Sequence, residues 1–372
     1  IIKDTGSTSA STDWSLGAFS DTTGHPSCVS FFEQRLVFAA TLSQPQTVFF
    51  SKSGDYENMD ANIGGTVADD DAIIYTIASN QVNAIRFMAA SRTLIIGTAG
   101  GEFTVTGGGD NNAITPTNIM IKKQSNHGAA NIDAVAVANA TLFVQRAKRK
   151  IRELAYNFDV DGYTAPDLTI LAEHVTEGGI IEMAYQEEPL AIIWCVRNDG
   201  ELVALTYQRE QQVVAWHRHV FAGAFGSGNA VCESVAVIPT EDSEYELYMI
   251  IKRTINGATK RYVEFLNTFD FDESDNTSFN FLDSQLSYSG SSATTISGLS
   301  HLEGQEVSIL ADGATHPNKT VSSGSITLDR AATKVKVGLG YTSLLKTMRI
   351  DAGAQNGTSQ AKTKRIYEVT AR

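Results

Sequence analysis

The sequence has few cysteines, few prolines and little charge, and each shortage narrows the kind of protein that it encodes. Its 372 residues include 3 cysteines and 7 prolines, and only 19% of them are charged. The cysteines, Cys28, Cys195 and Cys232, are odd in number and far apart, and each lies in a strand-like apolar run. That placement favours buried free thiols over disulfides. No Cys/His pair has the spacing of zinc ligands, so no metal residue is assigned.

The sequence also lacks long apolar runs and long runs of basic residues. No apolar run approaches the length that spans a bilayer, and no basic-then-apolar leader opens the chain, so we expect neither a membrane span nor secretion by that route. The net charge is −13 without a long Lys/Arg block, which argues against tight general binding of nucleic acid. One basic cluster, at 146–152, is interpreted as a solvated hairpin, with contact to a polyanion as the less favoured alternative. Because the chain starts at Ile1 without a methionine, we interpret it as a piece of something longer.

What the sequence does contain is a repeat of short apolar strands. Five such runs start 58, 48, 50 and 55 residues apart: RLVFAAT (35–41), TLIIGTA (93–99), TLFVQRA (141–147), AIIWCVR (191–197) and ELYMIIK (246–252). Each lies between two further strand-like runs, often across a turn such as Asp199-Gly200 or Asn256-Gly257. Blades of a β-propeller have four strands and repeat at roughly this interval. The sequence therefore predicts an all-β chain built on a β-propeller of repeated four-stranded blades.

Composition divides the chain into four parts. Residues 1–27 are rich in Ser, Thr and Gly and are expected to lead in from a preceding, platform-type region. The propeller, with about five visible blade repeats, is assigned to 28–267, and 268–282 is assigned as an acidic linker. Short alternating strands joined by Gly-, Asn- and Pro-bearing turns predict a small all-β platform-type domain, a sandwich or barrel, at 283–372.

The fourth strand of each blade is the least regular, and 167–175 and 213–220 are candidates for it. The second candidate holds His217 and His219, which strand alternation places on one face, with Trp216 on the other. A zinc site would need two further ligands. We therefore interpret these histidines as ordinary strand residues.

Other stretches resemble sites only in part. Residues 157–162, NFDVDG, match the first half of a calcium loop, but the twelfth position is Leu168 instead of Glu, which favours a turn between blade strands. The acidic runs 69–71 and 270–274 could hold a hard cation weakly but are interpreted as solvated loops. The glycine-rich run 101–112 lacks the Lys-Ser/Thr of a phosphate loop. No catalytic or cofactor-binding residue is assigned, no cofactor is expected, and the chain is not expected to be an enzyme.

Three longer phrases are more specific than the periodicity. They are HPSCVSFFEQRLVFAATLSQPQTVFFSKSGDYENMD (25–60), LTILAEHVTEGGIIEMAYQEEPLAIIWCVRNDGELVALTYQREQQVVAWHRH (168–219), and HLEGQEVSILADG with ITLDRAATKVKVGLGYTSLLKTMRIDAG (within 301–353). In these phrases the chain resembles the tail nozzle proteins, or tail tubular protein B-like proteins, of short-tailed bacteriophages. The resemblance runs through most of residues 25–372.

That resemblance implies a propeller attached to β-rich platform domains, in a structural virion protein without catalytic residues. The implied assembly is a homohexameric ring below the portal and adaptor proteins that closes and gates the DNA channel and docks tail fibres. Viral DNA would pass through transiently, without sequence-specific binding. The expected location is the virion tail, after synthesis in the cytoplasm of the host bacterium. The alternative is a glycan-binding or glycan-depolymerising propeller at the tail tip, in which exposed tryptophans would stack on sugar.

Overall fold

The computed structural model describes residues 18–62, 65–78, 83–108, 112–241, 244–267 and 275–346, and the single residues 363, 365 and 368. Regular structure in these residues consists of strands β1 to β25 and two short 3-10 turns. The acidic run at 270–274 and most of the chain after 346 lie outside the described residues.

Five successive antiparallel sheets, here called blades 1 to 5, make up the chain as far as residue 265. Blade 1 consists of β1 (Cys28–Phe32), β2 (Arg35–Ala39), β3 (Thr47–Phe50) and β4 (Ile73–Thr76). Blade 2 consists of β5 (Ile85–Ala90), β6 (Leu94–Thr98), β7 (Gly101–Thr106) and β8 (Met120–Ser125). Blade 3 consists of β9 (Val135–Val137), β10 (Ala140–Val144), β11 (Ile151–Asn157) and β12 (Gly162–Thr164).

Blade 4 consists of β13 (Ile180–Gln186), β14 (Ile192–Arg197), β15 (Leu202–Gln208) and β16 (Val213–His219). A small hairpin, β17 (Ala224–Phe225) and β18 (Gly228–Asn229), leads to blade 5, which has three strands: β19 (Val231–Pro239), β20 (Tyr245–Ile255) and β21 (Ala258–Phe265). Strand order within every blade follows the chain, which is the up-and-down order of propeller blades. The predicted all-β fold with repeated four-stranded blades is confirmed.

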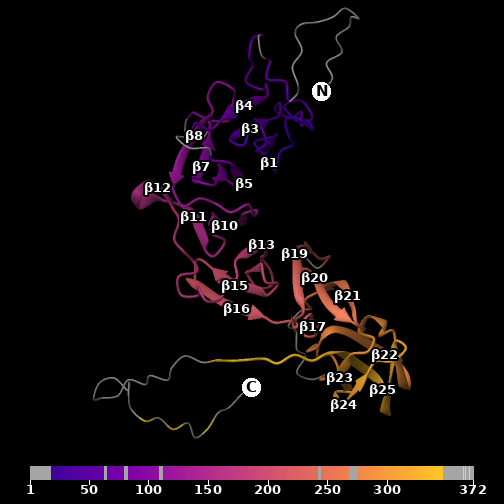
Figure 1. Ribbon diagram of the computed structural model, residues 1–372. Helices are drawn as coiled ribbons and strands as arrows, with labels where there is room; N and C mark the ends of the chain where they lie inside the picture. Colours follow the sequence, from indigo (N-terminus) through magenta and orange to yellow (C-terminus); the bar gives the residue numbers. More distant parts are fainter. Residues whose placement is uncertain are drawn as a thin grey trace, which may run out of the picture.

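Burial of the second strand of each blade shows how the blades stack. Strands β6, β10 and β14 are buried at every position, because their sheets are covered on both faces. Strands β2 and β20 instead alternate between buried and more exposed positions, because no further blade covers the outer faces of their sheets. On the outer face of blade 1, Phe19 packs against Phe38 and Phe49 and covers part of the sheet. Blades 1 and 5 are therefore the ends of an open arc, as Figure 1 shows.

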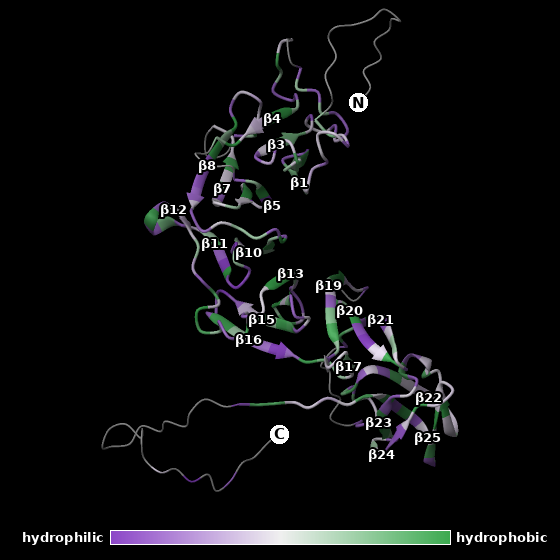
Figure 2. Cartoon of the chain, in the orientation of Figure 1, coloured by the Kyte–Doolittle hydropathy of each residue, from purple (hydrophilic) through white to green (hydrophobic). Residues whose placement is uncertain are grey.

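Apolar side chains from neighbouring blades fill the spaces between them. One core joins blades 1 and 2 through Val37, Phe50 and Ile96, and another joins blades 4 and 5 through Trp194 and Ile251. Figure 2 shows that the outer strand β8 is largely hydrophilic, whereas β1 and β13 carry more apolar colour. The inner strands thus supply the cores, and the outer strands lie nearer to solvent.

The C-terminal sheet, in the order β22-β25-β23-β24, forms a domain with its own core. Its strands are β22 (Asp283–Ser297), β23 (Glu306–Ala311), β24 (Ala314–Thr320) and β25 (Ser325–Leu339), with a 3-10 turn at Ser300–Leu302. Register shifts between the two long strands β22 and β25 bend the sheet, so that it encloses Leu299, Leu302 and Val335.

One of the two predicted fourth strands is wrong. Residues 213–219 form β16, as predicted, but the fourth strand of blade 3 is the short β12 and not 167–175. There the Asp167 side chain accepts hydrogen bonds from the backbone N–H (2.8 Å) and hydroxyl (2.5 Å) of Thr169. The Ala172 N–H then donates to the Thr169 carbonyl (2.8 Å). These local bonds form successive turns that compete with a strand ladder.

Candidate functional site

A polar hollow lies where the inner strands of the first four blades meet. Its volume is about 310 Å³, and its polar lining consists of Ser27, Arg86, Asn131, Asp133 and Glu182. These residues precede or belong to the first strand of blades 1, 2, 3 and 4, the strands nearest one another in the arc. The first strands thus bring together charged groups that lie far apart in the sequence.

The carboxylate of Glu182 joins this hollow to blade 5. Its Oε1 accepts a hydrogen bond from the Ser234 hydroxyl of β19 at 3.0 Å. On the opposite side the buried thiol of Cys28 lies within the electrostatic range of Asp133 and Arg86, although burial is the main reason why its pKa is raised. The hollow therefore combines two carboxylates with one guanidinium, an arrangement suited to hydrogen bonding of a polar surface.

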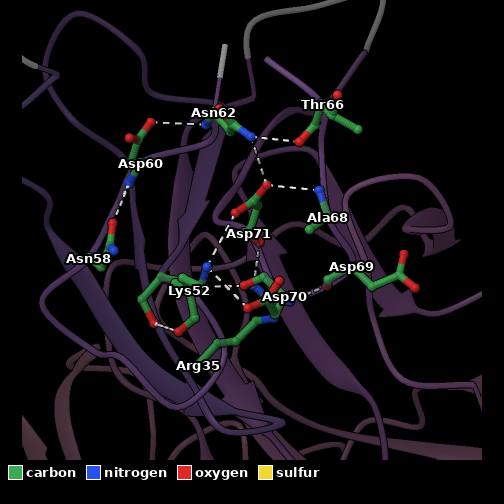
Figure 3. Close-up of polar contacts among 11 residues, drawn as sticks. Arg35, Lys52, Asn58, Asp60, Asn62, Thr66, Ala68, Asp69, Asp70 and Asp71 are labelled. Atoms are coloured by element: carbon green, nitrogen blue, oxygen red, sulfur yellow. Dashed lines mark hydrogen bonds and ion pairs between the residues drawn. The ribbon is translucent and has the colours of Figure 1, made fainter. Parts of the chain in front are cut away.

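The acidic run Asp69–Asp71 belongs to a loop that Arg35 and Lys52 contact from within the same blade (Figure 3). Arg35, which is 2% exposed, donates to the backbone carbonyls of Ser51 (2.7 Å), Asp69 (2.9 Å) and Asp71 (2.7 Å). A guanidinium has five donors in a fixed fork, so one buried arginine can fix several carbonyls of a loop at once. The loop is held by its backbone, and its carboxylates serve other contacts.

Two of those carboxylates pair with Lys52. Its ammonium lies 3.1 Å from Asp70 and 3.5 Å from Asp71. The other oxygen of Asp71 accepts from the Ala68 N–H at 2.8 Å, and this bond is the main reason why the pKa of Asp71 is lowered. Among the described residues no cluster of three His, Cys, Asp or Glu side chains is arranged to hold a metal ion. The loop is best described as an intrachain ion-pair cluster.

The two histidines of β16 form a pair against a buried tryptophan. His217 Nδ1 and His219 Nε2 are 2.7 Å apart, and the ring of His219 lies 5.0 Å from that of Trp194. His217 Nε2 also lies 3.2 Å from the Thr206 hydroxyl. Burial, and secondarily the neighbouring His217, lowers the pKa of His219 to about 4. Both rings are therefore neutral over the physiological range, and they pack on the side of blade 4 that contacts blade 5.

Trp216 points to the other side of blade 4, as strand alternation predicts. It packs against the core shared by blades 3 and 4, and its indole N–H donates to the Leu168 carbonyl at 2.9 Å. Trp194 is 1% exposed. The alternative of a glycan-binding propeller expects exposed tryptophans. That expectation is wrong for Trp194, which is buried, and Trp216 is half-buried. Trp14 lies outside the described residues.

The two remaining motifs are both turns. In the calcium-like stretch, Asn157 caps the 3-10 turn Phe158–Val160, and the Asp161 carboxylate accepts from the Tyr156 hydroxyl at 2.6 Å. The stretch connects β11 to β12 as a turn between blade strands. The basic cluster 146–152 includes the turn between β10 and β11, where Lys150 lies 2.8 Å from Asp167.

Two fully buried charged residues were not singled out from the sequence. Arg253 is 0% exposed and pairs with Glu264 at the boundary with the C-terminal domain. Glu102 is also 0% exposed, and burial raises the pKa of its carboxyl. Both lie in strand-like runs, and a charged residue inside such a run was the signal that could have drawn attention to them.

All three cysteines are free and buried, as predicted. Burial raises the pKa of each thiol, that of Cys232 to about 12. A thiol that stays protonated is a poor nucleophile. The cysteines therefore act as small apolar side chains of the blade cores.

Each end of the arc exposes apolar side chains of a sheet face, although Phe19 covers the Phe38–Phe49 part of the blade 1 face. The blade 1 end face contains Val29, Phe31 and Ile74, which are 61%, 60% and 47% exposed. The blade 5 end face contains Ile238, Ile250, Val263 and Phe265, of which Val263 is 73% and Phe265 53% exposed. In the blades between them, the corresponding faces are covered by the next blade.

Comparison with known proteins gives structural likeness only. No family model matches the chain, and no curated protein matches it. Solved structures that are similar in part include an auxiliary nutrient binding protein from Bacteroides thetaiotaomicron (10% identity, TM-score 0.36, 64% of this chain and 57% of that one). A second is the Cps50 (Swd1) β-propeller domain of Myceliophteria thermophila (9% identity, TM-score 0.38, 66% of this chain and 74% of that one). A third is a protein from Lactobacillus plantarum (8% identity, TM-score 0.37, 84% of this chain and 87% of that one).

These likenesses are too distant to bear on function. The chain spans just over half the length of the nutrient binding protein. The fold assignment rests on the order and stacking of the blades themselves. The described residues also contain no helix long and apolar enough to cross a membrane.

Proposed function

We propose that this chain is a structural subunit of the tail nozzle of a short-tailed bacteriophage. In this role it contributes to a ring of identical copies that closes and gates the DNA channel below the portal and adaptor proteins and docks tail fibres. The observation that carries the proposal is the open arc of blades, which ends in two different apolar faces. Subunits that use two different surfaces form heterologous contacts, and such contacts generate rings.

The joint between blade 5 and the C-terminal domain supports this role. The Asp283 carboxylate at the start of β22 accepts from the Ala222 N–H at 2.7 Å. The buried Arg253 of β20 donates to the Ala222 carbonyl at 2.8 Å, and its partner Glu264 accepts from the Ser284 hydroxyl at 2.5 Å. Buried charge-assisted bonds of this kind hold two parts in one orientation. A platform domain that transmits a ring movement needs such a joint.

The charge balance suits a channel protein that DNA passes without adhering. The chain carries a net charge of −13 and no long run of lysine or arginine. Carboxylates repel phosphates, whereas tight binding of DNA needs clustered lysine and arginine.

Electron cryo-microscopy of virions that carry the full-length protein tests the proposal. We expect six copies around an axial channel at the tail end. Copies in a peripheral position, or an axial density that the five blades and the C-terminal sheet do not fit, would overturn it. An antibody against the C-terminal sheet that labels no part of the tail would count against it equally.

The hollow favours one second candidate, a glycan-binding or glycan-depolymerising propeller. Paired carboxylates are the groups that cleave glycosidic bonds, and Asp133 and Glu182 line one hollow of about 310 Å³. A glycan array, and an assay of reducing ends released from host polysaccharide, test this candidate. Binding or release that Glu182→Gln abolishes would favour it, and the absence of both would remove it.

A further inference from the structure

A half-buried arginine in the polar hollow has no partner within the described ranges. Arg86 of β5 lines the hollow, and its guanidinium forms neither an ion pair nor a hydrogen bond with another described residue. The other arginines of these ranges that are buried or half-buried all donate to carbonyl oxygens of the protein, and they are Arg35, Arg152, Arg197 and Arg253. A guanidinium carries five N–H donors, and withdrawing such a group from water without partners is costly. Arg86 is therefore positioned to bind an acceptor that the described chain does not supply.

Two β-bulges bring lining residues out of the regular strand alternation. In β5 the register passes from Ile85 directly to Phe87, which lie opposite successive residues of β6, so Arg86 is the extra residue. In β13 the same kind of register shift makes Ile181 the extra residue. Both extra residues line the hollow, on the concave side of the arc in Figure 1. A bulge redirects a side chain, and bulges are frequent next to functional sites for that reason.

Two carboxylates line the same hollow without pairing with Arg86. Asp133, which precedes β9, is exposed and forms no hydrogen bond or ion pair through its side chain with another described residue. Glu182 of β13 accepts from the Ser234 hydroxyl through Oε1 at 3.0 Å, and no described donor bonds its Oε2. The buried Cys28 thiol lies within electrostatic range of both Asp133 and Arg86, so these two charges are near one another. The hollow thus offers one positive and two negative groups to a ligand.

The charges of the hollow decide which ligand suits it. A simple anion would pair with Arg86 but would be repelled by the two carboxylates, and a simple cation would leave the guanidinium without a partner. A ligand with one carboxylate and one ammonium group suits both sides, because each of its charges meets an opposite charge. The apolar residues Ile132, Ile181 and Met183 complete the lining. A volume of about 310 Å³ is at the lower limit of small-molecule sites, which suits a compact ligand with a short apolar part.

We propose that the hollow binds a free α-amino acid with an apolar side chain. The carboxylate of the ligand pairs with the guanidinium fork of Arg86 on blade 2, and its ammonium group lies between Asp133 of blade 3 and Glu182 of blade 4. Its side chain packs on Ile181 and Met183. One ligand then links three blades through charge-assisted bonds, so its binding also stabilises their arrangement. Such a ligand differs from the polysaccharide of the second candidate function, and its binding is independent of a role in a phage tail.

Calorimetric titration of the full chain with leucine tests the proposal. We expect saturable binding with a Kd of about 1 mM or tighter. Two matched compounds each lack one charge, since 4-methylpentanoate has no ammonium group and 3-methylbutylamine has no carboxylate. Each should bind at least about tenfold more weakly than leucine, because one side of the hollow loses its counter-charge. Equal binding of all three compounds, or no binding of leucine, would overturn the proposal.

Substitutions then assign the charges to residues. Arg86→Met should abolish measurable binding of leucine, and Glu182→Gln should weaken it about tenfold. The matched control is Arg92→Met, which removes the same charge from the exposed connection between β5 and β6 and should leave binding unchanged. Urea denaturation shows whether each variant is folded, and Asp133→Asn repeats the test at an exposed position that the fold does not depend on.

Two results would overturn the assignment of this ligand. Undiminished leucine binding by folded Arg86→Met or Asp133→Asn would show that leucine binds elsewhere. Binding of glucuronate without binding of leucine would assign the hollow to the glycan candidate. Neither result depends on whether the protein belongs to a phage tail.

Discussion

Removing the charge of Glu264 is the sharpest test of how blade 5 is joined to the C-terminal domain. Arg253 is 0% exposed, its Nη2 lies 3.1 Å from Glu264 Oε2, and its Nη1 bonds the other carboxylate oxygen. Its Nε donates to the Ala222 carbonyl at 2.8 Å. Glu264→Gln keeps the shape of the side chain but removes the carboxylate that bonds the buried guanidinium directly, so that Arg253 retains only the more distant electrostatic interaction with Asp283.

The expected loss is large because arginine does not give up its proton when it is buried. Breaking one partner of a buried ion pair typically costs about 3–5 kcal/mol, since the remaining charge is left uncompensated. Replacing both partners by apolar residues of similar volume is often neutral or better. Arg253→Met with Glu264→Leu should therefore be more stable than Glu264→Gln alone.

Urea denaturation, followed by far-UV circular dichroism and by fluorescence of Trp194 and Trp216, measures these losses. The matched control is Glu177→Gln, which removes the same charge from an exposed pair, with Glu177 3.7 Å from Arg149 and side chains 71% and 54% exposed. Such surface pairs contribute about 0–1 kcal/mol. The reasoning is refuted if Glu264→Gln loses no more than Glu177→Gln, or if the double replacement is the less stable of the two Arg253–Glu264 variants.

Three further predictions concern the blades. The pKa of His219 is about 4 in the fold and about 6.5 when unfolded, so the unfolded chain binds more protons between these values. The contribution of His219 to stability, about 3 kcal/mol, is therefore complete near pH 7 and is lost as the pH falls from about 6.5 towards 4. In His219→Asn the urea midpoint should therefore change less with pH over this range. A pH dependence equal to that of the wild-type chain would count against the low pKa of His219. Trp194→Ala should lose about 3–5 kcal/mol and Trp194→Phe less, because the larger truncation leaves a larger cavity between blades 4 and 5; equal losses would contradict this. The three cysteines Cys28, Cys195 and Cys232 should react with thiol reagents only as fast as the native chain unfolds, because all three are buried. Fast labelling without denaturant would show that a cysteine is accessible.

The strands that could be predicted are those with the strongest apolar pattern. Strands β6, β10 and β14 are buried on both faces, so each appears in the sequence as a continuous apolar run. The outer strands give a weaker signal, because one side lies near solvent and some are very short. The three-residue β12 escaped prediction for this reason, and the apolar residues of 167–175 were assigned to a strand although Asp167 and Thr169 form a turn there.

The candidate sites could also be predicted only in part from the sequence. Alternation was enough to place His217 and His219 on one face of a strand, but it could not show that they pack on Trp194. From the sequence, an acidic run such as Asp69–Asp71 is interpreted as a solvated or a cation-binding loop. The sequence does not show that Lys52 pairs with its carboxylates or that Arg35 bonds its backbone. Pairing between distant residues depends on the register of strands, and register is set by turns and by packing together.

The sequence by itself determined that the chain is all-β, that its blades repeat and that its thiols are buried, because these features depend on local patterns of apolar residues. Tertiary structure alone decided that the blades form an open arc, that Arg86, Asp133 and Glu182 share one hollow, and that blade 5 has three strands among the described residues. These features depend on which sheet faces and edges meet across long separations in the chain. The free energy of such contacts comes from burial and hydrogen bonding between distant segments, and no local pattern records it.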